Sequence, residues 1–214
     1  EAAGLVKGFQ FRNEVEMAHA GTALRWVYDE PSALVTSIGP GALQAMAGSL
    51  AAASNGIGLY HIYGDETTHG EGYNMQQIPK LEQGLYSKMT SILGDSYVLH
   101  TPESMRDALR RGTLCVNHPY KAGPFYFLLP MNIQNKTADF NLSIFPEVPH
   151  FPEKTPIDKT IQDQAINLMT QYDKIVIKAG GGCLSVSDEL TAFAESIGAA
   201  VVVSPKSTGV IPDD

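Results

Sequence analysis

The chain has 214 residues, of which 43% are hydrophobic and 18% charged, so it can bury the core of one large domain or of about one and a half ordinary ones. Its net charge of −8, with scattered Lys and Arg, argues against nucleic-acid binding. No apolar run approaches the length of a membrane span, no signal segment follows Glu1, and the two distant cysteines make no metal spacing. We therefore expect no membrane partner and a reducing, cytoplasmic setting.

Apolar, β-branched stretches alternate with helical stretches along most of the chain. A helix of small residues is expected to begin at Glu14. The expected strands of the first part are residues 33–37, 58–63, 97–100 and 124–129. The expected helices between them are residues 42–53, residues 76–92 with a break at Gly84, and residues 101–117, which begin Thr-Pro-Glu. This alternation predicts an α/β fold, with a mostly parallel sheet flanked by helices.

A proline-rich stretch divides the chain. Four prolines between Pro146 and Pro156 predict an extended linker over residues 146–157. Beyond it we expect a helix over residues 158–171, a strand over 174–178, a helix over 187–197 and a strand over 200–204. The predicted organisation is one domain over residues 1–145 and an incomplete second α/β unit over residues 158–214.

The run from Arg12 to Gly41 carries the clearest motif. It begins Arg-Asn-Glu-Val-Glu-Met-Ala-His-Ala-Gly and ends Val-Thr-Ser-Ile-Gly-Pro-Gly-Ala. One acid and one glycine turn thus lie where open α/β folds bind ligands, at the carboxyl edge of a parallel sheet. This run resembles the pyrimidine-binding domain of thiamine-diphosphate enzymes of the acetolactate synthase superfamily, and within it the trihydroxycyclohexanedione hydrolase branch.

The resemblance implies a domain organisation as well. Residues 1–145 resemble a pyrimidine-binding domain of the thiamine-diphosphate-binding fold that lacks the family's first strand and helix. Residues 178–182 and 205–212 resemble the start of the family's central domain. The family's diphosphate-binding domain, which holds Mg²⁺, has no counterpart in this chain. We therefore expect a fragment, a partly ordered chain or one subunit of a split enzyme.

The resemblance assigns the catalytic and cofactor-binding acid to Glu14, which would hydrogen-bond the pyrimidine ring of thiamine diphosphate. A carboxyl in this role should be partly desolvated so that it can share a proton. The alternative is an acid that only stabilises a helix N-terminus through the helix dipole. Glu16 lies two residues further on, hence on a different face of the helix, and is expected to face solvent.

The other candidates for binding the cofactor lie at the end of the expected strand 33–37 and in the turn after it. Thr36 and Ser37 can contribute hydroxyls, and the turn Gly39-Pro40-Gly41 lets backbone approach a ligand. A plain strand-to-helix turn is the alternative.

Two further segments have weaker motifs. Gln76 or Gln77 is the substrate-side candidate, the alternative being a helix-start glutamine. Some family members hold FAD or ADP on the central domain, and a stand-alone nucleotide-binding module would use Gly180-Gly181-Gly182. Because this run is not Gly-x-Gly-x-x-Gly, a tight turn is the favoured interpretation.

The leading hypothesis is the pyrimidine-binding part of an enzyme that cleaves or forms a C–C bond next to a carbonyl. Hydrolysis of a cyclic diketone is the best guess. A keto-acid decarboxylase or acetolactate synthase-like enzyme, and a non-catalytic structural or regulatory subunit, stay open.

The resemblance implies partners, because family sites form between the pyrimidine domain of one protomer and the diphosphate domain of another. A homodimer, a tetramer or a partner subunit is therefore expected. The Ala- and Met-rich faces of residues 14–24 and 42–53 could supply the interface. Alternatively, they pack only on their own sheet.

Overall fold

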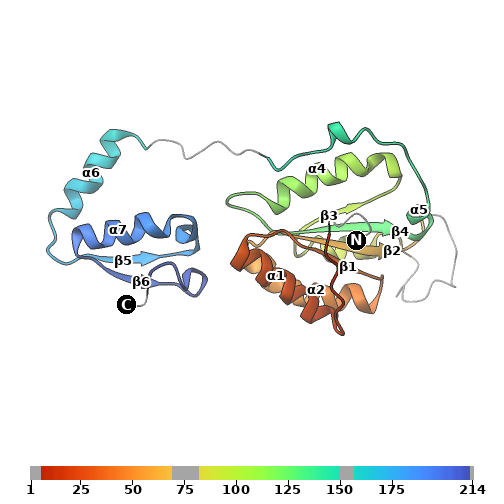
Figure 1. Cartoon of the computed structure of the whole chain (residues 1–214), viewed down its shortest axis with the longest axis horizontal. Helices are drawn as coiled ribbons and strands as arrows, with labels where there is room; N and C mark the ends of the chain where they lie inside the picture. The colour runs from red at the N-terminus through yellow and green to blue at the C-terminus, as the bar shows by residue number, and fades with distance from the viewer. Residues whose placement is uncertain (1–5, 69–81, 150–156, 213–214) are drawn as a thin grey trace. The chain divides into compact units, whose positions relative to one another are not determined.

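The computed structural model describes residues 6–68, 82–149 and 157–212. The chain divides into two compact units, residues 1–150 and 151–214 (Figure 1). Both are built from parallel strands and helices, which confirms the predicted α/β class. No helix in the described ranges is long and apolar enough to cross a membrane.

A four-stranded parallel sheet forms the centre of the first unit, in the order β1-β2-β4-β3. Its strands are β1 (Ala33–Thr36), β2 (Leu59–Asp65), β3 (Asp95–Val98) and β4 (Pro124–Pro130). Helices α1 (Glu14–Tyr28) and α2 (Pro40–Asn55) lie below the sheet in Figure 1 and α4 (Met105–Val116) lies above it. The short helix α3 (Leu85–Thr90) packs with α2, and α5 (Met131–Gln134) follows β4 directly.

Two predicted helices differ from the observed ones. Residues 76–81 lie outside the described residues, and α3 begins only at Leu85, because Gly84 before it is left-handed with φ 77°. The break expected at Gly84 is therefore confirmed. The helix expected from Thr101 opens with a 3₁₀ turn (Pro102–Ser104), and the Thr101 side chain makes no capping hydrogen bond.

Helix α1 begins and ends at residues suited to those positions. The Asn13 side chain accepts hydrogen bonds from the amides of Val15 (2.8 Å) and Glu16 (3.3 Å), which satisfies two unpaired donors of the first turn. At the other end Asp29 is left-handed with φ 55° and its amide donates to the Arg25 carbonyl. Glu14 is therefore the first residue of a well-capped helix.

Small residues let α1 and α2 approach each other closely. A Cβ atom on Gly48 would lie 2.7 Å from both Ala18 Cβ and the Val15 carbonyl oxygen, closer than real atoms pack. Ala18, Ala42 and Ala45 are fully buried in the core of their own unit. The inner faces of the two helices thus pack against each other and on their own sheet.

The core beneath α2 contains a buried aromatic and polar group. The ring of His61 stacks on Tyr126 at 4.7 Å, and its Nδ1 lies within hydrogen-bond distance of the Tyr63 hydroxyl, at 2.8 Å. The Tyr126 hydroxyl lies 2.6 Å from Ser49 Oγ. The other ring nitrogen, Nε2, is buried and has no hydrogen-bond partner among the described residues. Burial lowers the pKa of His61 to about 3, so the ring stays neutral.

The second unit is smaller. Strands β5 (Val176–Ala179) and β6 (Ala200–Val203) form a parallel pair, accompanied by helices α6 (Lys159–Met169) and α7 (Ser187–Ile197). The Gly-rich turn after β5 continues as a 3₁₀ helix (Gly181–Val186). The buried Ser207 hydroxyl donates a 2.8 Å hydrogen bond to the Ala179 carbonyl, which ties the 3₁₀ turn after β6 to the end of β5.

Gly58, just before β2, gives a test of the packing. A Cβ atom there would lie 1.8 Å from the Val116 carbonyl oxygen, so Gly58→Ala must move backbone. We expect a loss of about 2–4 kcal/mol in the free energy of unfolding. Urea unfolding followed through Trp26, the chain's single tryptophan, measures it in this unit. Gly123→Ala is the control, because nothing lies within 4 Å of its added carbon, and equal losses would contradict the packing described.

Candidate active site

The turn after β1 starts helix α2 with a conformation that only glycine adopts readily. Gly39 occupies the capping position with φ 78° and ψ −128°, and Pro40 takes the first helical position. Gly39 and Gly41 are buried, whereas Ser37 and Pro40 are exposed. The turn therefore reaches the surface through Ser37 and Pro40 at the carboxyl edge of β1, where the sequence predicted a ligand.

Three of the predicted residues converge around a fourth, Gly41. The position that a Cβ atom would take on Gly41 lies 2.4 Å from Thr36 Oγ1, 3.1 Å from Ser37 Oγ and 3.3 Å from Glu14 Oε1. A side chain at this position would displace the two hydroxyls and the carboxylate. We call Glu14, Thr36, Ser37 and Gly41 the acid–glycine cluster.

Glu14 and Glu16 differ in solvent exposure, as expected. Glu14 is half-buried and Glu16 is exposed. Glu14 belongs to the first turn of α1 and its carboxylate also faces the first turn of α2, so both helix dipoles stabilise its negative charge. The helix-stabilising role considered from the sequence is thus compatible with a ligand-binding role.

The predicted substrate-side residues Gln76 and Gln77 lie outside the described residues. The chain on either side is held in place by hydrogen bonds. Gln83 Nε2 donates to the Thr67 carbonyl (3.2 Å), and the Gly84 amide donates to Glu66. The Thr68 amide donates to Asn132 Oδ1 on α5 (3.0 Å). Residues 66–68 and 83–84 are therefore connected near the carboxyl ends of β2 and β4.

A buried acid pair at the end of β2 was not predicted from the sequence. Asp65 is 2% exposed and Glu66 is 8% exposed. Burial raises the pKa of Asp65 to about 6, the Glu66 amide that it accepts from partly offsets this, and the Glu66 charge adds to the increase. Only the position of these acids directly after an apolar strand could have indicated them. Neither burial nor their mutual repulsion follows from the residue types.

A pocket of about 320 Å³ opens at the carboxyl ends of three strands. It is lined by residues 35–38 of β1 and the turn after it, 62–64 of β2, Leu129 of β4, and Met131 and Gln134 of α5. It shares Thr36 and Ser37 with the acid–glycine cluster.

The structure gives less support to a metal or nucleotide site than to the acid–glycine cluster. No group of three or more His, Cys, Asp or Glu side chains in the described ranges is arranged to hold a metal ion. The Gly-rich turn after β5 packs under a side chain, because a Cβ atom on Gly181 would lie 2.7 Å from Lys206 Cγ and Cδ. That contact fits the tight-turn interpretation.

The fold and the cluster thus define a parallel α/β domain with an acid–glycine site at its sheet edge. We compared the chain with known proteins to find its relatives. No family model matches the chain. The 3D-(3,5/4)-trihydroxycyclohexane-1,2-dione hydrolase of Bacillus subtilis is 27% identical over 99% of the chain, and 2-hydroxyacyl-CoA lyase 1 of Dictyostelium discoideum is 29% identical over 96%. The acetolactate synthase large subunit of Buchnera aphidicola is 30% identical over 84%.

These relatives confirm the predicted resemblance. The chain is homologous to thiamine-diphosphate-dependent enzymes of the acetolactate synthase superfamily, and trihydroxycyclohexanedione hydrolases are among those it matches. It spans about a third of the length of each of these relatives.

Asp65 gives a stability test with a defined sign. Its folded-state pKa of about 6 lies above the ordinary 3.8, so the fold favours the protonated acid. Its contribution to stability is full below pH 4 and is lost as the pH rises through 6, by at most about 3 kcal/mol. Asp65→Asn, which cannot ionise, should therefore be more stable than the parent by about 1–3 kcal/mol at pH 7.5 and nearly equal to it at pH 4.

Urea unfolding at the two pH values measures this difference, and the exposed Asp139→Asn controls for the loss of one charge. A stabilisation of the same size at both pH values would contradict a raised pKa for the buried Asp65.

Proposed function

We propose that this chain is the pyrimidine-binding part of a thiamine-diphosphate-dependent enzyme that cleaves or forms a C–C bond next to a carbonyl. The observation that carries the proposal is the convergence of Glu14, Thr36 and Ser37 on Gly41 at the carboxyl edge of the sheet. A carboxylate and two hydroxyls can pair with the nitrogen-rich edge of a pyrimidine ring. The homology to such enzymes supports it independently.

The chain's own residues have definite tasks in this proposal. Thiamine diphosphate, when bound, supplies a carbon nucleophile and an electron sink for the bond being broken. Glu14 would hold or accept a proton at a pyrimidine nitrogen, from a half-buried position at the start of α1. Thr36 and Ser37 would orient the ring, and Gly41, which has no side chain, lets both hydroxyls and the Glu14 carboxylate lie close together.

The proposed reaction is hydrolysis of a cyclic diketone. Several of the matched relatives are named trihydroxycyclohexanedione hydrolases, which supports this choice over keto-acid decarboxylation or acetolactate-type synthesis. A non-catalytic structural or regulatory subunit is the other candidate. The half-buried acid beside a glycine argues against it, because a pocket without chemistry gains nothing from desolvating a carboxylate.

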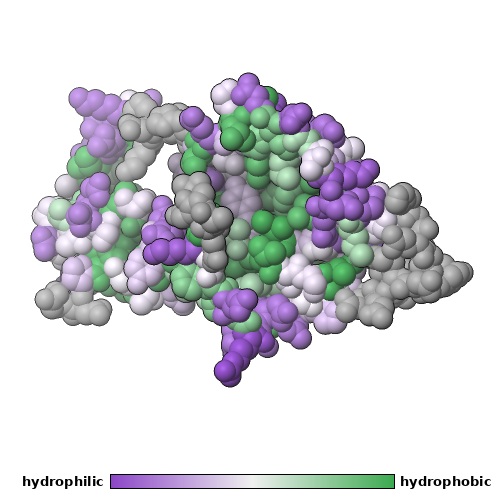
Figure 2. Space-filling view, turned by 45° about the vertical axis from the view of Figure 1, so that its right-hand side comes forward, coloured by the Kyte–Doolittle hydropathy of each residue, from purple (hydrophilic) through white to green (hydrophobic). Residues whose placement is uncertain are grey.

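The proposal requires a partner for the diphosphate end of the cofactor. Mg²⁺ and the diphosphate would be held by a domain or subunit outside these 214 residues, in a homodimer, a tetramer or a mixed complex. Leu43 (46% exposed) and Leu50 (56%) on α2 are candidates for the contact. Figure 2 shows, in green, that apolar residues reach the surface on the face it draws. The relatives give no support to FAD or ADP. A cytoplasmic location remains part of the proposal.

Glu14→Gln tests the function in the protein purified from its native source with any chain that accompanies it. The amide keeps the shape but cannot take up a proton. We expect kcat for thiamine-diphosphate-dependent hydrolysis of a cyclic diketone to fall at least about 100-fold. Glu16→Gln, two residues away and exposed, should keep its kcat within about twofold. Equal rates for Glu14→Gln and the parent would refute the proposal.

A further inference from the structure

The backbone turn between β1 and α2 has two neighbours that are remote from it in the sequence. One is the end of β2, because a Cβ atom on Gly64 would lie 3.2 Å from the Ile38 amide nitrogen. The other is Tyr86 of α3, whose hydroxyl forms a hydrogen bond with the Gly39 backbone. The turn that leads into the acid–glycine cluster thus contacts both β2 and α3.

Gly39 depends on partners outside its own helix. Its φ of 78° and ψ of −128° belong to a region that glycine alone enters readily, and it carries no side chain to cap α2. The Gly39 carbonyl accepts from the Leu43 amide within α2. The first amides of a helix, however, have no partner inside it. A group that binds the Gly39 amide therefore also fixes the conformation of the turn.

Tyr86 is well placed to fix this turn because it is itself held by packing. It is 2% exposed and belongs to one core cluster with Ala42 and Ala45 of α2. Helix α3 begins directly after Gly84, whose amide donates to Glu66 at the end of β2. A close-packed ring has little freedom to move, so the hydroxyl keeps its position relative to α2 and β2.

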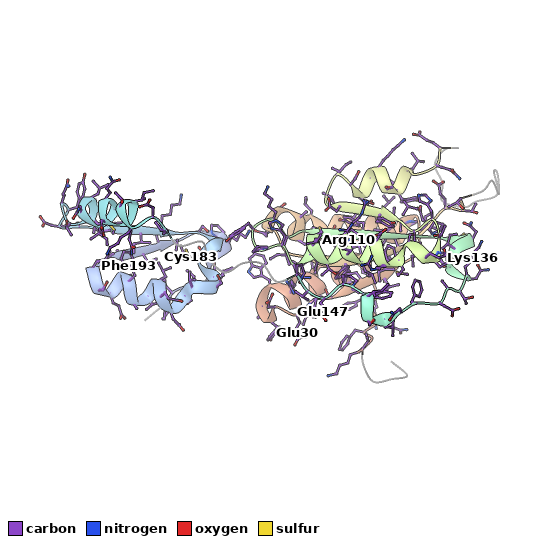
Figure 3. The ribbon with its side chains drawn as sticks, turned by 90° about the horizontal axis from the view of Figure 1, so that it is seen from above. Glu30, Arg110, Lys136, Glu147, Cys183 and Phe193 are labelled. Atoms are coloured by element: carbon purple, nitrogen blue, oxygen red, sulfur yellow. The ribbon has the colours of Figure 1, made fainter. Side chains whose placement is uncertain are left out.

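The surroundings of Tyr86 keep its hydroxyl a neutral phenol. Burial raises the pKa most, the acid pair at the end of β2 raises it further, and the bond with Gly39 lowers it. A hydrogen bond that lowers the pKa of a phenol is one donated to its oxygen, so the Gly39 amide is the donor. The cations labelled in Figure 3, Arg110 and Lys136, are exposed and are not among these causes.

We propose that Tyr86 is a positioning residue for the cofactor: its hydroxyl fixes the Gly39 amide, and with it the turn from which Ser37 and Gly41 meet Glu14. This inference rests on the proposed function, in which these groups orient the pyrimidine ring. Tyr86 is buried and acts only through Gly39. Because Glu14 belongs to α1, its proton chemistry does not require this bond. Loss of the hydroxyl should therefore weaken cofactor binding more than it slows the chemical step.

Amide hydrogen exchange in the 214-residue chain, followed by NMR without cofactor, tests the hydrogen bond itself. Tyr86→Phe keeps the buried ring and removes only the hydroxyl. We expect the Gly39 amide to lose at least about tenfold of its protection, because without its acceptor the turn opens locally.

Tyr60→Phe is the matched control. It removes a tyrosine hydroxyl that lies 3.3 Å from Thr113 Oγ1 on α4 and leaves the bond to Gly39 in place. Its Gly39 amide should keep its protection within about twofold. Urea unfolding of both variants corrects for any loss of global stability. Equal protection of Gly39 in Tyr86→Phe and the parent, or equal losses in the two variants, overturns the proposal.

The second readout uses the protein from its native source with any chain that accompanies it. In Tyr86→Phe we expect the Kd for thiamine diphosphate with Mg²⁺, measured by calorimetry, to rise about tenfold. The kcat for hydrolysis of a cyclic diketone at saturating cofactor should stay within about threefold. A merely structural defect would instead reduce the active fraction, and so lower kcat while leaving Kd unchanged. That outcome overturns the positioning role.

The Tyr86 and Glu14 experiments can fail separately. Lost protection of Gly39 with unchanged cofactor affinity, in a protein that Glu14→Gln inactivates, would refute the positioning role and leave the proposed function in place. Full activity of Glu14→Gln would refute the proposed function, and with it the role toward the cofactor, whatever the exchange of Gly39 shows.

Discussion

The close approach of helices α1 and α2 is the constraint on which the rest of the first unit depends. At Gly48 the two backbones leave no room for a side chain beside Ala18 and the Val15 carbonyl. This contact sets how the helices lie on the sheet, and so brings the first turn of α1 next to the first turn of α2. Glu14 and Gly41, 27 positions apart in the sequence, meet because of it. Small residues in these helices thus serve the site through packing.

Several polar side chains are buried in the core next to the sheet edge that holds the site. His61, Tyr63, Tyr126 and Ser49 sit under α2 in hydrogen-bonded and stacked pairs, with His61 Nε2 left unpaired among the described residues. Further along β2, Asp65 is buried against its own preference for water. Such groups reduce stability, and three of them, His61, Tyr63 and Asp65, lie on β2, which ends at the pocket. A site that must orient a polar ligand gains rigidity from them, which is one reason for a fold to retain groups that a purely apolar core would replace.

The sequence predicted more of the cluster than of the pocket. Arg12 to Gly41 is continuous, so its acid, hydroxyls and glycine turn could be recognised together, and the structure places four of them around one point. The pocket combines β1 with Leu129 and Gln134, residues that no local pattern connects. The roles assigned to Gln76 and Gln77 remain predictions. The acid pair Asp65 and Glu66 was missed because burial depends on how α3 and the sheet close over it.

Local properties of the sequence determined the α/β class, the strand and helix order, the left-handed Gly84 before α3 and the glycine turn before α2. Each depends on periodicity or on backbone preferences that a few neighbouring residues express. The tertiary structure alone decided that Glu14 faces Gly41, that Asp65 is protonated more readily than an ordinary acid, and that Gln134 lines one pocket with β1 and β2. These properties depend on distances and solvent exclusion between segments remote in sequence, which only packing establishes.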